Sequence, residues 1–475
     1  VQQLRDWSMR PQHRQHLFDW LRECPPEILW QYPQVVLIIM RRMFSLNMVP
    51  EMLQVKEWYV TALERNTALS QRERDNYYGE LEVILSFLAF NSITGMSEHH
   101  RRAYKLLSGA PQTLSKQGIW TFGAPSVLGL YLRTGCSLRQ TVEDMQECMP
   151  PYYLLSGWHG AGAAELTEAE ALLLQGRVDE MDMPLQKAYY QAEKHGQECI
   201  TICCDFLAMQ RDLCRGVYSS KAEAYSRQQW QLQPWKQSML LNTADMCAGF
   251  YYALLGKLEY IPSWLTDGNG QQPSVLYPAR PCRNYISAQC LLAQHQYTEL
   301  LVRWSDWEQE CRPYSNFLCL LYLQVQRAAA FAGRGDVTSC RASLKQALAM
   351  AAPDKLVLPL AQNIALLRPY LEQEAQGEYA ELAAVALHLG QQLEAGRGQI
   401  MSTRFAEAGL QELTEQELQI AQLAAARHTN REIAQRLSLS EGTIKQYLNK
   451  IFAKLQIDAA AKNKRHQLER FFPNS

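Results

Sequence analysis

The sequence lacks the segments that would place a protein in or across a membrane. Its longest apolar runs are about six residues, as at 35–40, whereas a membrane-spanning helix needs roughly 20. Residues 1–6 are polar and lead directly into a helical pattern, so they do not have the form of a signal peptide. We therefore expect a cytoplasmic protein with no membrane partner.

An excess of charge of one sign is also lacking. The 47 Lys and Arg residues nearly balance the 48 Asp and Glu residues, which gives a net charge of -1. This balance excludes a protein that coats DNA along its whole length, but a small DNA-binding module on a neutral body remains compatible with it. From Leu410 onward ten Lys and Arg stand against seven Asp and Glu, a balance of +3, so the preceding residues carry -4. That asymmetry has the sign that DNA binding requires.

Motifs of metal sites and enzymes are missing as well. None of the 13 cysteines forms a Cys-x-x-Cys pair, and Cys199, Cys203, Cys204 and Cys214 have the spacing of buried apolar positions on helices. Their odd number in a large chain favours a reducing cytosol. His-Glu-x-x-His and Gly-x-Ser-x-Gly are absent, and no carboxylate pair has a partner base. We predict no metal site, no cofactor in this chain and no enzymatic activity.

What the sequence does have is helical periodicity along nearly its whole length, with almost no strand-like alternation. In a recurring unit, an apolar helix ends in a Gly-containing turn and a second helix with spaced Ala and Leu follows, most clearly at 169–188 and 328–347. Each such hairpin must bury a face against its neighbour, which produces a superhelix. We predict an all-α fold with a tetratricopeptide-like helical-repeat domain over residues 1–390, although an antiparallel bundle can produce a similar pattern.

A linker is predicted over residues 391–409, because the stretch from Gly390 to Gly398 is polar and interrupted by glycines. The composition changes at Leu410, and residues 410–475 are predicted to form a separate domain. Thr414 is suited to begin its first helix, since Glu417 three residues later completes a capping box.

Two further helices follow in this domain. Thr429 or Asn430 caps a helix over 431–437, and after a short turn Ser440 caps another over 441–455. The last of these places Ile444, Leu448, Ile451 and Leu455 on one apolar stripe and leaves polar residues on its other faces. This is the arrangement of a helix-turn-helix motif, in which the second helix enters the major groove.

Asn and Gln side chains can bond adenine edges, and Lys can reach guanine or a phosphate. Hydroxyl groups at a helix N-terminus are placed to contact phosphates. On this basis the predicted DNA-binding residues are Thr429, Asn430, Ser440, Thr443, Lys445, Gln446, Asn449 and Lys450.

The same segment resembles the four-helix LuxR-type DNA-binding domain over residues 410–472. The resemblance rests on Leu413-Thr414, Glu417, the run at 430–434 (NREIA), the run at 439–445 (LSEGTIK) and Lys454-Leu455. It implies that Lys445, Gln446 and Asn449 lie on the helix that enters the groove, and that Lys454 lies near the DNA backbone. Promoter DNA and RNA polymerase are the implied partners, and the chain is expected to bind as a homo-oligomer.

Three positions depart from the pattern of this family. Arg427 replaces a common Gly before the second helix, Tyr447 stands where His is usual, and Ala460 where Arg is usual. The last change removes a cation, for which Lys462, Lys464 and Arg465 are candidates to compensate.

The front of the chain, residues 16–33, resembles the start of the helical-repeat domain in large MalT-like regulators, in which an ATPase precedes a helical-repeat sensor and a LuxR-type domain. No Gly-x4-Gly-Lys-Ser/Thr phosphate loop occurs in this sequence. We therefore expect the chain, which starts at Val1, to be the C-terminal part of a longer protein, and assign no nucleotide binding to it.

Aromatic residues near Gly- and Pro-containing breaks are candidates for a ligand pocket in the repeat domain. They would suit an inducer such as a sugar or an aromatic metabolite, and they are Trp120, Phe122, Tyr152, Tyr153, Trp158 and His159. The alternative is that these side chains fill wedges between irregular hairpins.

Two functions remain open. The chain is either a DNA-binding transcriptional regulator, expected to be an activator, whose helical array senses an inducer or partner and controls promoter binding. Or it is an interaction scaffold whose array recruits another protein and whose last domain tethers it to DNA.

Overall fold

A computed structural model describes residues 14–25, 28, 31–226, 238–267, 275–405, 413–455, 457, 465, 468 and 471–472, and all regular structure in these residues is helical. The prediction of an all-α fold is thus confirmed. None of the helices in these segments is long and apolar enough to cross a membrane. The chain divides into two compact units: Val1–Arg211 with Ser219–Gln391, and Asp212–Tyr218 with Gln392–Ser475.

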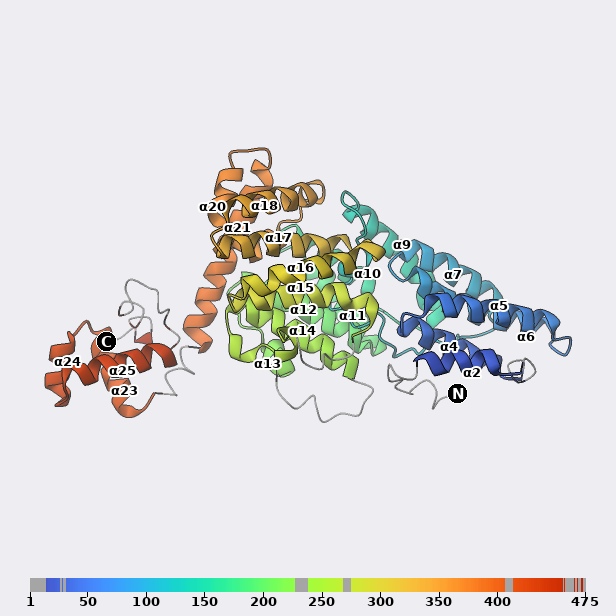
Figure 1. The fold of residues 1–475 in the computed structure, drawn as a ribbon, viewed down its shortest axis with the longest axis horizontal. Coiled ribbons are helices and arrows are strands. Elements are labelled where there is room, and N and C mark those ends of the chain that lie inside the picture. Colours follow the sequence, from blue (N-terminus) through green and yellow to red (C-terminus); the bar gives the residue numbers. More distant parts are fainter. Residues whose placement is uncertain are drawn as a thin grey trace. The chain divides into compact units, whose positions relative to one another are not determined.

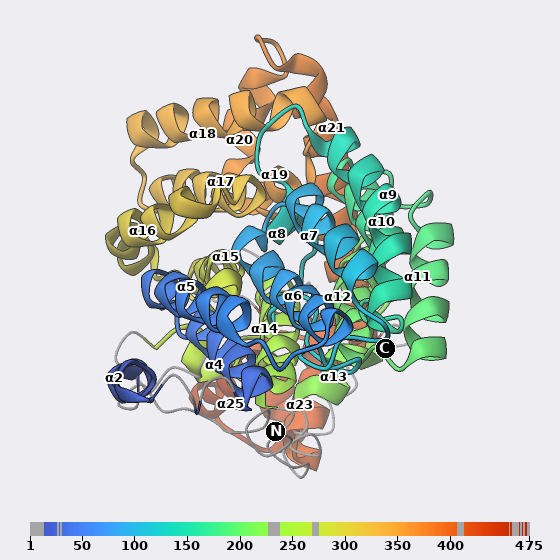
Figure 2. The same cartoon turned by 90° about the vertical axis from the view of Figure 1, so that its right-hand side faces the viewer.

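The first unit contains the long series of helices in Figures 1 and 2. Short 3-10 turns connect several of them. The helices are α2 (Arg14–Glu23), α4 (Pro33–Ser45), α5 (Val49–Arg65), α6 (Gln71–Ser86), α7 (Ile93–Leu106), α8 (Leu128–Tyr131), α9 (Leu138–Ser156), α10 (Ala163–Leu174), α11 (Asp182–His195), α12 (Glu198–Cys214), α13 (Ser220–Ser226), α14 (Ser238–Leu255), α15 (Arg280–Ala293), α16 (Tyr297–Cys311), α17 (Phe317–Gly333), α18 (Val337–Ala351), α19 (Leu358–Gln362), α20 (Ile364–Glu374) and α21 (Ala380–Ile400), of which α12 and α21 continue into the second unit.

Successive helices pack as hairpins. Helix α10 packs on α11, α15 on α16, and α17 on α18 (Figure 1). Helix α15 also packs on α17, as the first helices of neighbouring hairpins do in a helical array. This order supports the predicted helical repeat, whereas its tetratricopeptide character remains a prediction.

Glycines end the two hairpin helices at which the sequence indicated the repeat most clearly. Gly176 after α10 and Gly335 after α17 both have φ +77°, a left-handed conformation that residues with a Cβ adopt only at a cost. Beyond Gly335, the Asp336 side chain accepts a hydrogen bond from the Ser339 amide at 3.1 Å and so begins α18. The predicted order of helix, glycine turn and second helix is found at both places, and of the two second helices α18 is capped by a side chain whereas α11 is not.

Segments about 200 residues apart in the chain meet inside the first unit. The Asp354 carboxylate accepts from the amides of Ser137 and Leu138, at 3.1 and 3.2 Å, and thereby satisfies the start of α9. The Phe317 amide donates to the Leu132 carbonyl at 3.1 Å. Late hairpins of the array are therefore hydrogen bonded to early ones, a contact that helical periodicity alone does not predict.

The second unit combines the segment Asp212–Tyr218 with the last part of α21, which is followed by a π-helix, Met401–Phe405. The first part of the predicted linker 391–409 is thus helical, and residues 406–409 lie outside the described residues. The segment 212–218 packs on this helix so closely that a Cβ at Gly396 would overlap the Leu213 carbonyl. The glycine that suggested a linker has a packing role.

We expect Gly396→Ala to lower the free energy of unfolding by about 1–3 kcal/mol, because the added methyl group forces α21 away from the Leu213 carbonyl. Gly398→Ala is the matched control, since nothing lies within 4 Å of a Cβ there. Its higher helix propensity should raise stability by up to about 1 kcal/mol. Thermal unfolding followed by circular dichroism measures both, and equal effects at the two positions would contradict the packing role.

Candidate nucleic-acid interface

Three short helices form the described body of the C-terminal domain: α23 (Glu415–Ala425), α24 (Asn430–Leu437) and α25 (Glu441–Lys454). Each packs on the other two around a small apolar core. That core is built from Ile420, Ala421, Ala424, Ala425, Ile433, Ala434, Ile444, Leu448, Ile451, Leu455, Ile457 and Leu468. The predicted stripe of α25 thus faces inward, while the predicted fourth helix falls mostly outside the described residues.

Capping side chains fix where the helices begin. The Thr414 hydroxyl accepts from the Glu417 amide at 3.3 Å, and Glu417 Oε2 accepts from the Thr414 amide at 2.9 Å, so the predicted capping box is confirmed. Thr429, not Asn430, caps α24. It forms a second capping box with Glu432 that the Thr-x-x-Glu spacing would have indicated.

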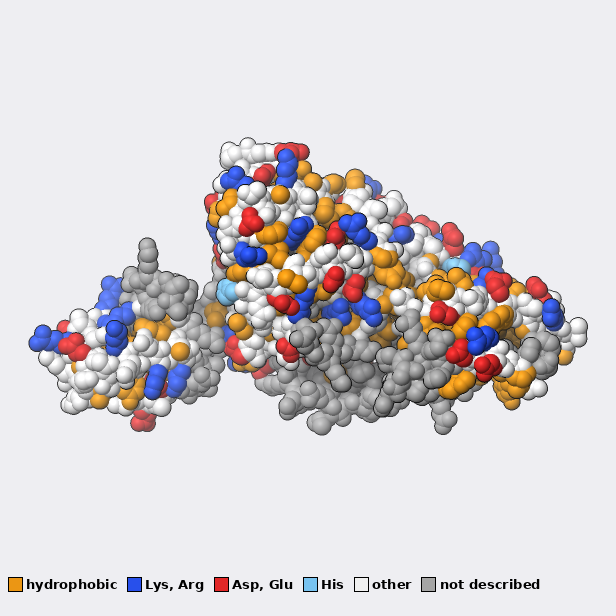
Figure 3. Space-filling model, in the orientation of Figure 1, with side chains coloured by type: hydrophobic (Ala, Val, Ile, Leu, Met, Phe, Trp, Pro, Cys, Tyr) orange, Lys and Arg blue, Asp and Glu red, His pale blue; other side chains and the backbone are white. Residues whose placement is uncertain are grey.

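The polar face of α25 is open to solvent. Lys445, Gln446, Asn449 and Lys450 are all exposed, and their spacing of one, three and one residues places them on one side of the helix. Figure 3 shows Lys and Arg side chains spread over the visible surface of this unit. The four side chains are free of the core, as major-groove contact requires, and their DNA contacts remain predictions.

Hydroxyl groups cluster at the start of α25. The exposed Ser440 Oγ accepts from the Thr443 amide at 3.0 Å and lies 2.8 Å from Thr443 Oγ1. Thr443 is half-buried. The predicted phosphate contacts of Ser440, Thr443 and Thr429 therefore involve side chains that already order the helix ends.

Lys454 has a partner inside the domain. Its Nζ lies 2.6 Å from Oε2 of Glu417, whose side chain is only 6% exposed and also bonds the Thr414 amide. The pairing with Lys454 is the main cause that lowers the pKa of Glu417. Lys454 thus joins the end of α25 to the start of α23, a role that the sequence analysis missed and that competes with the predicted contact to the DNA backbone.

Asn430, like Lys454, has a hydrogen-bond partner within the domain. The Arg465 guanidinium donates to the Asn430 side-chain oxygen and to the His428 carbonyl. From its position in the sequence, Arg465 is expected only to supply a compensating charge, and no local spacing relates it to Asn430, 35 residues earlier.

Two family departures have structural consequences. Tyr447 Oη donates to Gln416 Oε1 at 3.0 Å and adds another link between α25 and α23. Arg427 has φ +64°, in the left-handed region where glycine is favoured, which explains why glycine is the residue expected there. Ala460 lies outside the described residues.

The six predicted ligand residues belong to the first unit, and most of them are buried. Trp120, Phe122, Tyr152 and His159 are each at most 6% exposed, and Tyr153 is half-buried. Trp158 is 39% exposed and stacks on Tyr153 and on His195, with ring centroids 5.3 and 4.2 Å apart. These contacts are those of a packed interior with one aromatic residue at its edge, and ligand binding by this set remains a prediction.

The hydrogen bonds of His159 fix its protonation. Its Nε2 donates to the Gly118 carbonyl at 3.1 Å, since a carbonyl can only accept, and so Nδ1 accepts from the Tyr152 hydroxyl at 2.5 Å. Burial lowers the pKa of His159 to about 4. The imidazole is therefore held neutral.

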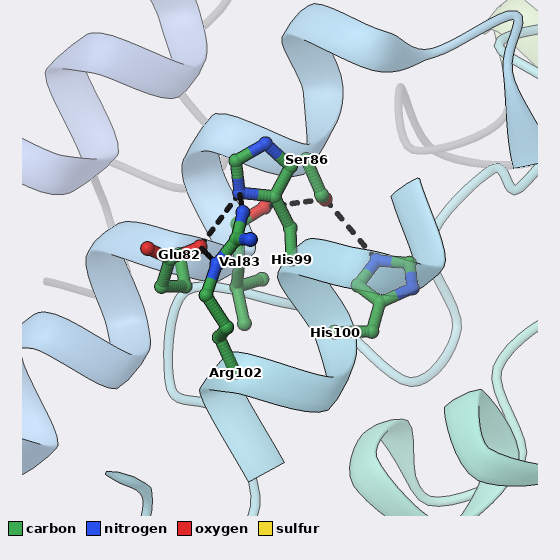
Figure 4. Close-up of polar contacts among 6 residues, drawn as sticks. All are labelled: Glu82, Val83, Ser86, His99, His100 and Arg102. Atoms are coloured by element: carbon green, nitrogen blue, oxygen red, sulfur yellow. Dashed lines mark hydrogen bonds and ion pairs between the residues drawn. The ribbon is translucent and has the colours of Figure 1, made fainter. Parts of the chain in front are cut away.

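A second buried histidine stacks on the same tyrosine. The His100 ring centroid is 4.5 Å from that of Tyr152, and its Nε2 bonds Ser86 Oγ at 3.1 Å (Figure 4). Ser86 in turn donates to the Val83 carbonyl at 2.7 Å, and burial lowers the pKa of His100 to about 3. The two imidazoles and the phenol between them connect α6, α7 and α9 through neutral groups.

The neighbouring histidine has a different environment. Figure 4 shows His99 turned away from His100 and toward Glu82 and Arg102. Its Nδ1 lies 2.6 Å from Glu82 Oε2, which also accepts from Arg102 Nε at 2.9 Å. Of these two adjacent residues of α7, His99 therefore belongs to an ion-pair cluster near the surface, and His100 is part of the buried interior.

The capped helices, the short turn between α24 and α25, and the exposed polar face of α25 define a helix-turn-helix DNA-binding domain. Residues 411–462 match the family of bacterial regulatory proteins, luxR family. No curated protein matches the chain. The LuxR-type domain assigned from the sequence is thereby confirmed, and it indicates a DNA-binding transcription regulator.

We expect Lys454→Met to lower the melting temperature of the C-terminal domain by roughly 2–8 °C, because it leaves the buried Glu417 carboxylate without its cation. In a Glu417→Gln background the same substitution should have a much smaller effect. A double-mutant cycle by calorimetry measures this coupling. Additive effects of the two substitutions would show that the pair contributes nothing to the fold.

The neutral histidines should make stability depend on pH. Their folded pKa values lie below the unfolded value of 6.5, so the unfolded chain binds more protons and stability falls as pH drops from about 6.5 toward 4. Between pH 7 and 5 we expect a loss of about 2 kcal/mol per buried histidine. His159→Gln should reduce the loss by that amount in urea unfolding at both pH values. An unchanged pH dependence would contradict the assignment.

Proposed function

We propose that this chain is a promoter-binding transcription regulator whose helical array senses a small-molecule inducer and controls DNA binding by the C-terminal domain. The match of residues 411–462 to the luxR family carries the DNA-binding part of the proposal. The exposed polar face of α25 supports it, because four exposed polar side chains are the chemistry that base edges and phosphates require. The resemblance of residues 16–33 to MalT-like regulators supports the sensory part.

Lys445, Gln446 and Asn449 are proposed to read base edges in the major groove. Lys450, together with the hydroxyls of Ser440 and Thr443 and the cap at Thr429, is proposed to contact phosphates.

One copy of this domain should bind DNA weakly. Its net charge from Leu410 onward is only +3, the Lys454 ammonium pairs with Glu417, and Asn430 is bonded to Arg465. Since affinity for DNA depends mainly on cations that neutralise phosphates, useful affinity would need two or more copies on repeated half-sites. We propose that the array controls this assembly, and that the bound oligomer recruits RNA polymerase and activates transcription.

Lys445→Ala and Asn449→Ala should each weaken binding to the cognate promoter by about 1–3 kcal/mol if both side chains read bases. Both residues are exposed, so the fold should be unaffected. Arg139→Ala is the control, because this cation is 91% exposed but lies on α9 in the repeat unit. Fluorescence anisotropy with promoter and scrambled duplexes tests the proposal. Unchanged promoter affinity in both variants would refute the assignment of these residues.

A further inference from the structure

The last hairpins of the array enclose a polar groove. Helices α18 and α20 both pack on α17 and lie side by side in Figures 1 and 2. Between them is a groove of about 440 Å³. Ligand pockets in proteins have volumes of about 300–1,000 Å³, so this space can hold a metabolite.

Two cations lie one helical turn apart on the α18 wall of this groove. Arg341 and Lys345 are both exposed, and like charges at this spacing disfavour a helix by a few tenths of a kcal/mol. Lys345 Nζ is 3.6 Å from Glu378 Oε2, but both side chains are about two-thirds exposed, so solvent screens that pair. The α18 wall therefore presents positive charge to whatever occupies the groove.

The opposite wall, on α20, presents hydrogen-bonding groups. Tyr370, Gln373 and Glu374 line it, and the Gln373 amide already accepts from Arg341 Nη2 at 2.9 Å. An amide, a phenol and a carboxylate can form hydrogen bonds with the hydroxyl groups of a ligand. The guanidinium and the ammonium of the α18 wall can both donate to the oxygens of a phosphate or carboxylate group.

We propose that the groove between α18 and α20 binds a small anionic metabolite that carries a phosphate or carboxylate group beside several hydroxyl groups. The anionic group lies against Arg341 and Lys345, and the hydroxyl groups face Tyr370, Gln373 and Glu374. This inference rests on the proposed sensory function and specifies its site. It places the inducer at a different site from the predicted aromatic set around Trp158, most of whose members are buried.

The position of the groove in the chain suits a sensor. Its α20 wall belongs to the hairpin whose second helix is α21, and residues 392–400 of α21 are part of the second unit, which contains the DNA-binding helices. A ligand that bridges α18 and α20 therefore acts on the hairpin that leads directly into the output unit.

Isothermal titration and thermal shift of the whole chain test the proposal with four probes: glucose 6-phosphate, gluconate, inorganic phosphate and glucose. Glucose 6-phosphate or gluconate should bind and raise the melting temperature, and the better of the two shows which anionic group is preferred. Inorganic phosphate should bind more weakly because it lacks the hydroxyl contacts. Glucose should not bind measurably.

Arg341→Gln and Lys345→Gln should each weaken binding of the best probe by roughly tenfold or more, the loss of one charge-assisted hydrogen bond. Ala342→Trp should abolish binding by filling the groove, since Ala342 lines it and is exposed. Arg139→Gln removes an exposed cation on α9, outside the groove, and should leave binding unchanged. Circular dichroism confirms folding, and the two Gln variants keep the test decisive if the Trp variant does not fold.

Different results would refute the proposed binding site and the proposed sensory function. If no anionic probe binds the wild-type chain, the proposed ligand class is wrong. If a probe binds but Ala342→Trp and Arg341→Gln bind it equally well, the chain senses the metabolite at another site and only the groove is refuted. Promoter binding, measured separately, tests the regulator itself and does not depend on either result.

Discussion

Close approach between helices is the constraint on which this structure depends. At several glycines the neighbouring helix or segment lies so near that a single Cβ would not fit. Gly129 faces the Cys282 sulfur, Gly333 the Tyr297 ring, Gly390 the Ile364 side chain and Gly396 the Leu213 carbonyl. Because packed interiors tolerate little added volume, these contacts fix the spacing of the hairpins and the path of α21. The groove between α18 and α20 therefore depends on the spacing of the hairpins.

The local elements of the fold could be predicted because their signals are local. Thr414 and Glu417 are three residues apart, and the glycine turns at Gly176 and Gly335 follow directly after apolar helices, so each feature is visible in a short window. The all-α fold and the LuxR-type domain follow from such windows. Contacts between distant residues do not. The ion pair of Lys454 and Glu417 joins residues 37 apart, and only the packing of α25 on α23 brings them together.

Contacts between distant residues also explain why most of the aromatic residues predicted to line a ligand pocket are buried. Their types and nearby glycines indicated a pocket, but sequence does not show which side chains a neighbouring helix covers. In the structure His159 bonds Tyr152 and the Gly118 carbonyl, and of the six residues Trp158 alone is exposed while Tyr153 is half-buried. The glycines of α21 were interpreted as a linker for the same reason, since Gly396 is explained by the Leu213 carbonyl, which lies far away in sequence.

The hydrogen bonds between early and late hairpins give the array a different mechanical character from that of an open solenoid. An open array folds and unfolds repeat by repeat, because each repeat contacts only its neighbours. Here Asp354 is bonded to the start of α9, and the Phe317 amide to the Leu132 carbonyl. The early and the late hairpins therefore each supply hydrogen-bond partners for the other. We expect the described part of the repeat unit to melt as one cooperative block and to fold slowly, because contacts at such long range must close large loops. A strain introduced at its last hairpins would then be shared by the whole block and not confined to one end.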